Sequence, residues 1–175
     1  MKLSIFIIIT SLMTTMTLFD FSKTSDTSQW TIEDDVVMGG RSQGHFKITD
    51  EGHGQFSGEV SLKNNGGFSS LRYNFDAKDV SSYSKLKLHL KGDGKTFQFR
   101  VKSTRRERAS YVYEFDTTTD WMTIEIPFKD LYPVFRGRRL NQSNYDGKQM
   151  EQIGFLIGNK KEQSFELLID KIELE

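Results

Sequence analysis

The chain of 175 residues has no cysteine, which excludes disulfides, thiolate metal sites and a cysteine nucleophile. Proline occurs only twice, and 24 Lys and Arg residues balance 24 Asp and Glu residues, so the formal net charge is zero. The absence of excess positive charge argues against duplex nucleic acid or an anionic membrane surface as a bulk electrostatic partner. The length suits one domain rather than two.

The N-terminus has the first two parts of a secretory signal, namely Lys2 and then the apolar run Leu3–Ile9. A membrane-spanning helix needs about 20 apolar residues, and threonine and serine interrupt this run. A cleavage site of the Ala-x-Ala type is missing, so a true start near Met16 and a cytoplasmic location are the alternative. We expect a leader over residues 1–17, export to the periplasm or the exterior, and a single domain over residues 18–175.

Aromatic residues make up 13% of the chain and alternate with polar residues in short segments separated by turns. A period of two is typical of β-strands with one buried face. Clear examples are Phe68–Phe75, Leu86–Leu90, Phe97–Val101, Trp121–Ile126 and Phe165–Leu174. No segment keeps a helical period over three turns, so the sequence predicts an all-β domain of about ten antiparallel strands, a sandwich or a barrel. We expect Gly92–Gly94 to turn a hairpin, and Pro127–Gln149 to form one long irregular loop.

Arginine side chains give the most informative pattern outside the predicted core. Arg72 and Arg100 lie on the polar faces of two predicted strands, and Gln98 lies two residues before Arg100. If the two strands share a sheet, these side chains form one polar platform, and the loop Arg136–Arg139 could reach over it. A guanidinium group presents a fork of donors that suits carboxylates, and sugar hydroxyls also accept from it. A solvated outer sheet face is the alternative interpretation.

The acidic segment Glu33–Asp35 precedes a Gly-Gly-Arg turn. Paired carboxylates can perform acid–base chemistry or bind calcium, and they also accept backbone N–H groups in loops. We expect the loop role, with Asp34 or Asp35 paired to an arginine from elsewhere in the chain. The histidines lack the spacing of metal ligands, and Gly92–Thr96 lacks the first glycine and the helix of a phosphate-binding loop. The sequence therefore predicts neither a metal site nor a cofactor.

Several motifs follow one another in order along the chain. They are LFDF (18–21), DDVVMGGRSQG (34–44), FSGEVSLKNNGGFSSLR (56–72), KGDGKTFQFR (91–100), FRGR (135–138) and IGFLIGNK (153–160). In this combination the chain resembles the complex I intermediate-associated protein 30 family over residues 18–174. The resemblance implies a jelly-roll β-sandwich like that of galactose-binding domains. Its mitochondrial members help to assemble NADH:ubiquinone oxidoreductase without being subunits of the finished enzyme.

The resemblance also implies a set of motif residues with a binding or structural role. They are Asp34, Asp35, Met38, Gly39, Gly40, Arg72, Gln98, Arg100, Arg136 and Arg138. Two features depart from the family pattern. The leader looks like a bacterial export signal rather than an arginine-rich mitochondrial transit peptide, and no G-x-G-x-x-G segment of a dinucleotide-binding domain is present.

The resulting expectation is a non-enzymatic binding protein of the assembly-factor or chaperone type. It would hold a protein partner on the face of Arg72, Gln98 and Arg100 through charge-assisted hydrogen bonds to carboxylates and burial of apolar surface. A carbohydrate-binding module of an exported bacterial protein, with a glycan as the ligand, is the alternative. A hydrolase that uses Asp34 and Asp35 has the least support, because the sequence shows no positioned partner acid or base.

Overall fold

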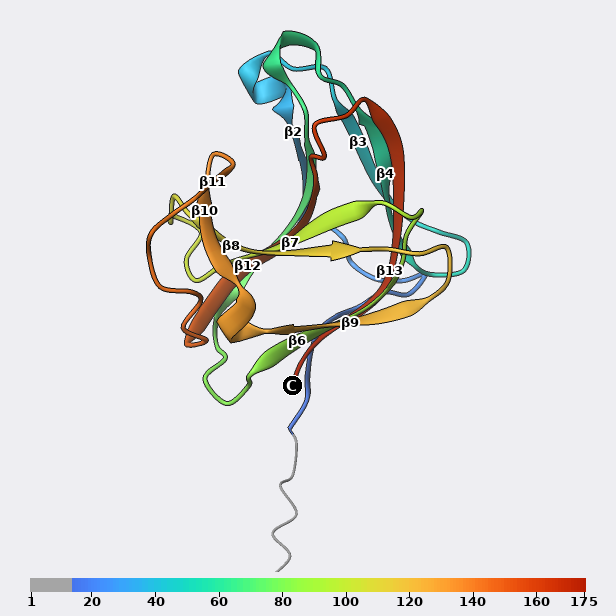
Figure 1. Cartoon of the computed structure of the whole chain (residues 1–175). Coiled ribbons are helices and arrows are strands. Elements are labelled where there is room, and N and C mark those ends of the chain that lie inside the picture. Colours follow the sequence, from blue (N-terminus) through green and yellow to red (C-terminus); the bar gives the residue numbers. More distant parts are fainter. Residues whose placement is uncertain (1–13) are drawn as a thin grey trace, which may run out of the picture.

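The structure is a computed structural model that describes residues 14–175, and it consists of two antiparallel β-sheets packed face to face (Figure 1). The predicted leader lies mostly outside the described residues. Its last four residues are described, and two of them, Met16 and Thr17, form part of the first strand, β1 (Met16–Asp20), where they pair with Leu174 and Glu173.

One sheet has six strands and the other has seven. The six-stranded sheet contains β1, β3 (Gln43–Ile48), β4 (Gly54–Val60), β6 (Lys85–Lys91), β9 (Met122–Pro127) and β13 (Gln163–Leu174). The seven-stranded sheet, in spatial order, contains β11 (Arg138–Arg139), β10 (Tyr132–Phe135), β8 (Ser110–Asp116), β7 (Thr96–Lys102), β12 (Gln149–Ile157), β5 (Ser69–Asp79) and β2 (Trp30–Asp34). The only helical segments in residues 14–175 are the 3-10 turns η1 (Asp35–Met38), η2 (Lys63–Asn65) and η3 (Phe128–Asp130). The prediction of an all-β sandwich is therefore confirmed.

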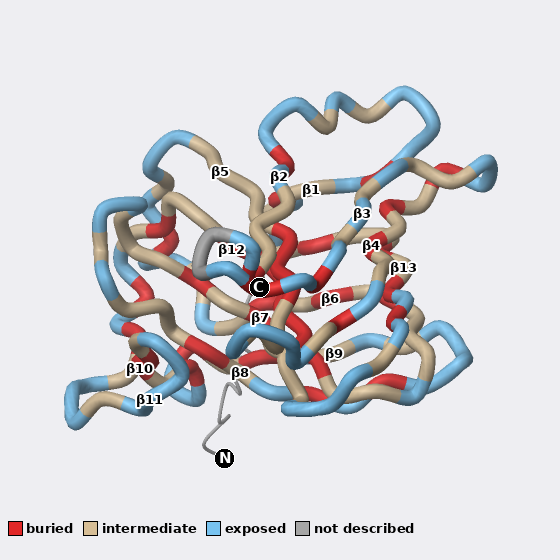
Figure 2. The backbone as a smooth tube through the Cα atoms, turned by 90° about the horizontal axis from the view of Figure 1, so that it is seen from above, coloured by how far each residue is buried: buried red, intermediate tan, exposed pale blue. Residues whose placement is uncertain are grey.

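The hydrophobic core lies between the sheets and follows the alternation seen in the sequence. Strand β6 buries its three leucines completely, and β7 buries Phe97, Phe99 and Val101 completely. Figure 2 shows the buried segments running through the middle of the molecule, with exposed segments at the loops. Each such side chain contributes about 1.5–3 kcal/mol on burial, so this pattern fixes which face of each strand points outward. The polar residues between them, including Gln98 and Arg100, are consequently displayed on the outer face of the seven-stranded sheet.

The predicted hairpin at Gly92–Gly94 is wrong. Strand β6 pairs with β9 and β13 in one sheet, whereas β7 pairs with β8 and β12 in the other. The turn therefore carries the chain from one sheet to the other across the end of the sandwich. Both strands bury their apolar faces in the same core from opposite sides, and alternation alone does not distinguish this arrangement from a hairpin.

The prediction of one irregular loop over Pro127–Gln149 is also wrong. Part of this stretch forms the hairpin of β10 and β11 at one edge of the seven-stranded sheet (Figure 1). Its two-residue turn is Arg136–Gly137, and both residues have positive φ (48° and 73°), as the favoured hairpin turns require. The strands have only four and two residues, too few to produce a recognisable period.

In residues 14–175, no helix has the length and apolarity to cross a membrane.

Candidate binding face

Two arginines flank a glycine on the outer face of the seven-stranded sheet. Gly154, on β12, is the register partner of Arg72 on β5 and of Arg100 on β7. Side chains of paired residues point to the same face, so the two arginines rise on either side of a position without a side chain. Their strands share a sheet, and β12 separates them. We define the arginine face by Arg72, Gln98, Arg100, Lys102, Glu114 and Gly154.

Hydrogen bonds order the side chains of the arginine face. Both terminal nitrogens of Arg72 donate to the carboxylate of Glu33 on β2, with 2.6 Å from Nη2 to Oε1. Arg100 donates from Nε and Nη2 to the Gln98 side-chain oxygen, at 3.2 and 2.7 Å. The Gln98 amide in turn donates to Glu114 Oε1 at 2.8 Å. The network thus neutralises Arg72 directly and leaves Arg100 bonded only to an uncharged group.

Arg100 is a cation without an acidic partner. No carboxylate in residues 14–175 forms an ion pair with it, and burial together with the charge of Arg72 lowers its pKa to about 10. Lys102 follows on the same face, and its Nζ donates to the backbone carbonyl of Glu107 at 2.6 Å. Burial and the charge of Arg72 lower the pKa of Lys102 as well. Two neighbouring cations on β7 are therefore held in a partly dehydrated environment.

Two apolar side chains lie among the polar side chains of the arginine face. Val112 is the register partner of both Arg100 and Tyr132, and it is completely buried. Leu156 is the partner of Gln98 and is only 8% exposed. Neither belongs to the core cluster between the sheets. An ordinary solvated sheet face would expose such residues, so this face is a covered, low-polarity surface rather than a simple outer layer.

A polar hollow of about 410 Å³ adjoins one end of the arginine face. Gln98 and Glu114 belong to its wall, together with the turn before β7 and the β12–β13 connection. That connection supplies Asn159, Lys160 and Lys161. At the other side, Arg139 on the edge strand β11 lies 4.5 Å from the ring centre of Tyr132 on β10. A ligand on the face therefore has room to extend into this hollow.

Asp34 and Asp35 do not pair with an arginine, so that part of the prediction is wrong. Asp35 is completely buried, and its carboxylate accepts hydrogen bonds from the Ser42 N–H, the Ser42 hydroxyl, the Gly67 N–H and the Phe68 N–H, at 2.5–3.2 Å. Burial alone would raise the Asp35 pKa, but these donors outweigh it and lower the pKa. Asp34 accepts from the Gly44 N–H at 2.9 Å. Both carboxylates therefore hold loops together at the end of the sandwich.

The other motif residues lie apart from the arginine face. Gly39 and Gly40 close the η1 turn through backbone hydrogen bonds to Val36 and Asp35, and the side chain of Met38 lies outside the described residues. Arg136 and Arg138 are in the exposed β10–β11 hairpin. Arg136 stacks over its neighbour Phe135 at 5.4 Å. In residues 14–175, no hydrogen bond or ion pair joins these two arginines to the arginine face.

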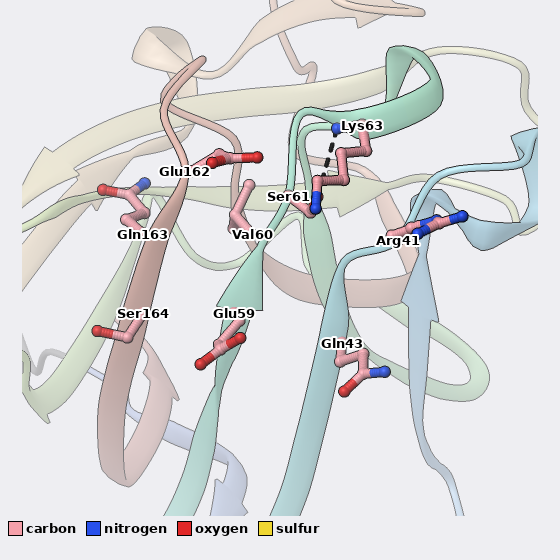
Figure 3. A pocket seen from close by; sticks show the side chains of 9 residues that line it. All are labelled: Arg41, Gln43, Glu59, Val60, Ser61, Lys63, Glu162, Gln163 and Ser164. Carbon is pink, nitrogen blue, oxygen red and sulfur yellow. Dashed lines mark hydrogen bonds between the residues drawn. The ribbon is translucent and has the colours of Figure 1, made fainter.

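A second hollow, of about 450 Å³, lies on the six-stranded sheet (Figure 3). Its lining is Arg41, Gln43, Glu59, Val60, Ser61, Lys63, Glu162, Gln163 and Ser164. Figure 3 shows Arg41 and Lys63 on one side and Glu162 on the other. Most of these side chains are exposed and make no ion pairs among the described residues. The hollow consequently lacks the fixed donors that the arginine face provides.

Two of the histidines form a cluster with the exposed Trp121 on the outer side of the six-stranded sheet. The Nδ1 atom of His53 lies 3.3 Å from Asp170 Oδ1, and the Nδ1 atom of His89 lies 2.9 Å from Asp170 Oδ2. Both imidazoles pack against the indole of Trp121. Trp121 is 38% exposed. No group of three or more His, Asp or Glu residues within 14–175 is arranged to hold a metal ion.

Sequence reasoning missed Glu33, Lys102, Glu114, Tyr132 and Gly154. Glu33 is one of three neighbouring acids, and its position on β2, two residues from the partner of Arg72, places its side chain on the same face as Arg72. Lys102 lies two residues after Arg100, so the alternation in the sequence already places its side chain on the same face as those of Gln98 and Arg100. Nothing in the sequence points to Gly154, because its position between the two arginines depends on which strand separates β5 from β7.

The family model described as complex I intermediate-associated protein 30 matches residues 19–169. Among solved structures, the family 11 carbohydrate-binding module of the cellulase Lic26A-Cel5E of Clostridium thermocellum is 19% identical, with a TM-score of 0.69 over 94% of this chain and 95% of that one. The same kind of module from Clostridium thermocellum in complex with a β-1,3-1,4-mixed-linked tetrasaccharide is 20% identical, with a TM-score of 0.69 over 94% and 96% of the two chains. An agarase matches at 11% identity and a TM-score of 0.62, over 92% of this chain and 24% of the agarase. These similarities show a shared β-sandwich fold.

Proposed function

Because the chain belongs to the complex I intermediate-associated protein 30 family, we propose that it is a non-enzymatic, assembly-factor-like protein that holds a protein partner on the arginine face. One observation carries this proposal. Arg100 is kept partly dehydrated and without an acidic partner on an outward-facing surface, beside a second unpaired cation, Lys102. Groups of this kind gain their missing contacts when a partner supplies acceptors.

The surroundings of the arginine face support a binding role rather than a catalytic one. The carboxylates that could perform acid–base chemistry, Asp34 and Asp35, already accept hydrogen bonds from the backbone. On the face itself, Glu33 pairs with Arg72 and Glu114 accepts from Gln98. These contacts hold a rigid array of donors in place, which favours recognition with little loss of side-chain entropy on binding.

Removal of the donors is expected to release the partner. In the double variant Gln98→Ala/Arg100→Ala, recovery of co-purifying protein should fall at least about tenfold, because hydrogen bonds to charged groups contribute about 1.5–3 kcal/mol each. The measurement is quantitative mass spectrometry of affinity-purified full chain, with Arg41→Ala as the control for loss of an exposed arginine elsewhere. Equal recovery from the wild type and the double variant would show that the partner binds another surface.

A glycan is the second candidate ligand, because the neighbours in fold include a module solved with a bound tetrasaccharide. The polar hollow beside Gln98 and Glu114 could accept sugar hydroxyls. The aromatic ring of Tyr132, which lies beside the arginine face, is however already covered by Arg139. A glycan array with signals lost in the Gln98→Ala/Arg100→Ala variant would favour this candidate, and an array without signals above background would remove it.

We also propose that the chain is exported through its leader. Met16 and Thr17 pair with the last strand, so cleavage is expected before Met16, which leaves β1 intact. Intact-mass spectrometry of protein from the periplasm or the medium should therefore give a mature chain that begins at residue 14, 15 or 16. Recovery of the full-length chain from the cytoplasm alone would contradict export.

A further inference from the structure

Two arginine-rich turns lie side by side at one corner of the seven-stranded sheet. One is the β7–β8 turn, residues 103–109, and the other is the β10–β11 hairpin turn, Arg136–Gly137. Strand β8 begins at Ser110, which pairs with Val134 near the end of β10, so both turns leave the sheet at the same end (Figure 1). We define the basic corner by the six arginines of the two turns and of β11, namely Arg105, Arg106, Arg108, Arg136, Arg138 and Arg139.

Positive charge predominates at the basic corner. All six arginines are exposed, and their one ion pair among residues 14–175 joins Arg105 Nε to Glu151 Oε2 at 3.8 Å. Burial and the charges of Glu107 and Asp146 raise the pKa of Tyr111 near the start of β8, which places two further acids close to the turns. Six cations therefore face three carboxylates in a chain whose formal net charge is zero.

The backbone beneath these arginines is ordered, and the space above it is open. The Lys102 ammonium group donates to the Glu107 carbonyl at 2.6 Å, which holds the β7–β8 turn. In the hairpin, the Leu140 N–H donates to the Pro133 carbonyl at 2.9 Å. A Cβ atom on Gly137 would meet no other atom within 4 Å. The long arginine side chains consequently extend from fixed positions into solvent.

The basic corner offers charge without apolar surface. No exposed large hydrophobic side chain of residues 14–175 lies in either turn. The guanidinium group of Arg136 lies 5.4 Å from the ring centre of Phe135. Arg139 covers Tyr132 at 4.5 Å, so both rings of β10 are occupied. Protein interfaces bury apolar surface, membrane insertion needs apolar side chains, and single-stranded nucleic acids stack on free rings, so the corner suits none of these three ligands.

We propose that the basic corner binds a sulfated polysaccharide, whose sulfate esters accept hydrogen bonds from the arginines. A guanidinium fork donates two parallel hydrogen bonds to a tetrahedral oxyanion such as phosphate, and a sulfate ester presents the same geometry. A flexible, hydrophilic chain can follow both turns, whereas duplex DNA is stiff over a distance far longer than this corner. The inference goes beyond the proposed function, because none of the six arginines belongs to the arginine face.

Isothermal titration calorimetry of the full chain with a heparin octasaccharide, at about 0.15 M sodium chloride, tests the proposal. We expect saturable binding, at least about tenfold tighter than that of the unsulfated heparosan octasaccharide, which lacks the oxyanions that the arginine forks bind. The affinity should fall by more than about tenfold at about 0.5 M sodium chloride, because binding releases counterions. A duplex DNA of equal total charge should bind more weakly than the heparin octasaccharide.

Removal of charge from either turn should weaken binding. The variants Arg136→Gln/Arg138→Gln, in the hairpin, and Arg106→Gln/Arg108→Gln, in the β7–β8 turn, should each lower the affinity at least about tenfold. All four arginines are exposed and form no ion pair among residues 14–175. The melting temperatures of both variants should therefore stay within about 4 °C of the wild type.

The control Arg41→Gln/Lys63→Gln removes the same net charge from exposed positions outside the basic corner. It should change the affinity less than about twofold, because exposed charges beyond a Debye length are screened. An equal loss in the control, or a loss from only one of the two turns, would overturn a site built by both turns. Binding of heparosan or duplex DNA as tight as that of heparin would overturn the sulfated ligand.

Recovery of the protein partner separates this inference from the proposed function. The partner should be recovered equally from the wild type and from the variants of the basic corner, since the arginine face is intact in all of them. Loss of heparin binding with normal partner recovery is the result that we expect. Loss of the partner together with heparin would show that the two ligands share one surface and would contradict a separate polysaccharide site.

Discussion

Replacement of Asp35 by alanine is expected to lower the free energy of unfolding at pH 7 by about 3–5 kcal/mol. The Asp35 carboxylate is completely buried and joins three segments, since it accepts from Ser42, Gly67 and Phe68. Alanine would leave these donors buried without acceptors. Urea unfolding followed by circular dichroism measures the change, and Asp120→Ala, at an exposed position, should change the value by less than about 0.5 kcal/mol.

The contribution of Asp35 should also depend on pH. Its folded-state pKa is lower than the usual value of about 3.9, so the ionised carboxylate stabilises the folded state above that value. This stabilisation is lost as the pH falls through the lower, folded-state pKa. The difference between the wild type and Asp35→Ala should therefore narrow when the unfolding series is repeated at pH 3. An unchanged difference between pH 7 and pH 3 would contradict the assignment of the ionised form.

Reversal of the charge at Arg100 is expected to reduce the affinity for the partner about 100-fold without unfolding the protein. In Arg100→Glu, the new carboxylate lies near Arg72 and Lys102 and repels the acceptor groups that the partner would place there. Loss of a buried charged contact accounts for about 2–5 kcal/mol of binding free energy. Titration calorimetry with the partner identified by affinity purification measures the loss.

The stability of the same variant separates a binding role from a structural one. Because Arg100→Glu introduces an ion pair where the wild type has an unpaired cation, its free energy of unfolding should stay within about 1 kcal/mol of the wild type or exceed it. Arg41→Glu is the matched control and should bind the partner normally. If Arg100→Glu unfolds at much lower urea concentration than the wild type, Arg100 has a structural role that the described contacts do not explain.

Much of this fold could be predicted from the sequence, because alternation fixes the buried face of each strand. It placed Phe97 and Phe99 inside and Gln98 and Arg100 outside, as the structure confirms. Alternation does not specify strand order, so it does not distinguish the crossing between sheets at Gly92–Gly94 from a hairpin. Short strands carry too little pattern, which hid the β10–β11 hairpin.

Which residues make up the site also depends on the pairing and order of the strands, which alternation does not specify. Pairing of β2 with β5 puts Thr31 opposite Arg72 and Glu33 opposite Ser70, so Glu33 shares the outer face with Arg72. The side chain of Asp34 points to the opposite face of the sheet, because side chains alternate along β2. Asp35 begins the η1 turn, so neither of these acids lies on the face of Arg72. Three adjacent acids are indistinguishable by composition, and only the register of this pair of strands tells which one meets the arginine.

The most direct test of the central claim is photo-crosslinking from single cysteines, which the cysteine-free chain makes possible. Thr31→Cys, opposite Arg72, places a benzophenone maleimide beside the arginine face. Thr123→Cys, opposite His89, places the same probe on the outer face of the six-stranded sheet. Both threonines are exposed, so labelling should leave the fold intact. We predict a crosslink to the partner from position 31 that disappears with Arg100→Glu, and none from position 123; a crosslink from position 123 alone would contradict a binding site on the arginine face.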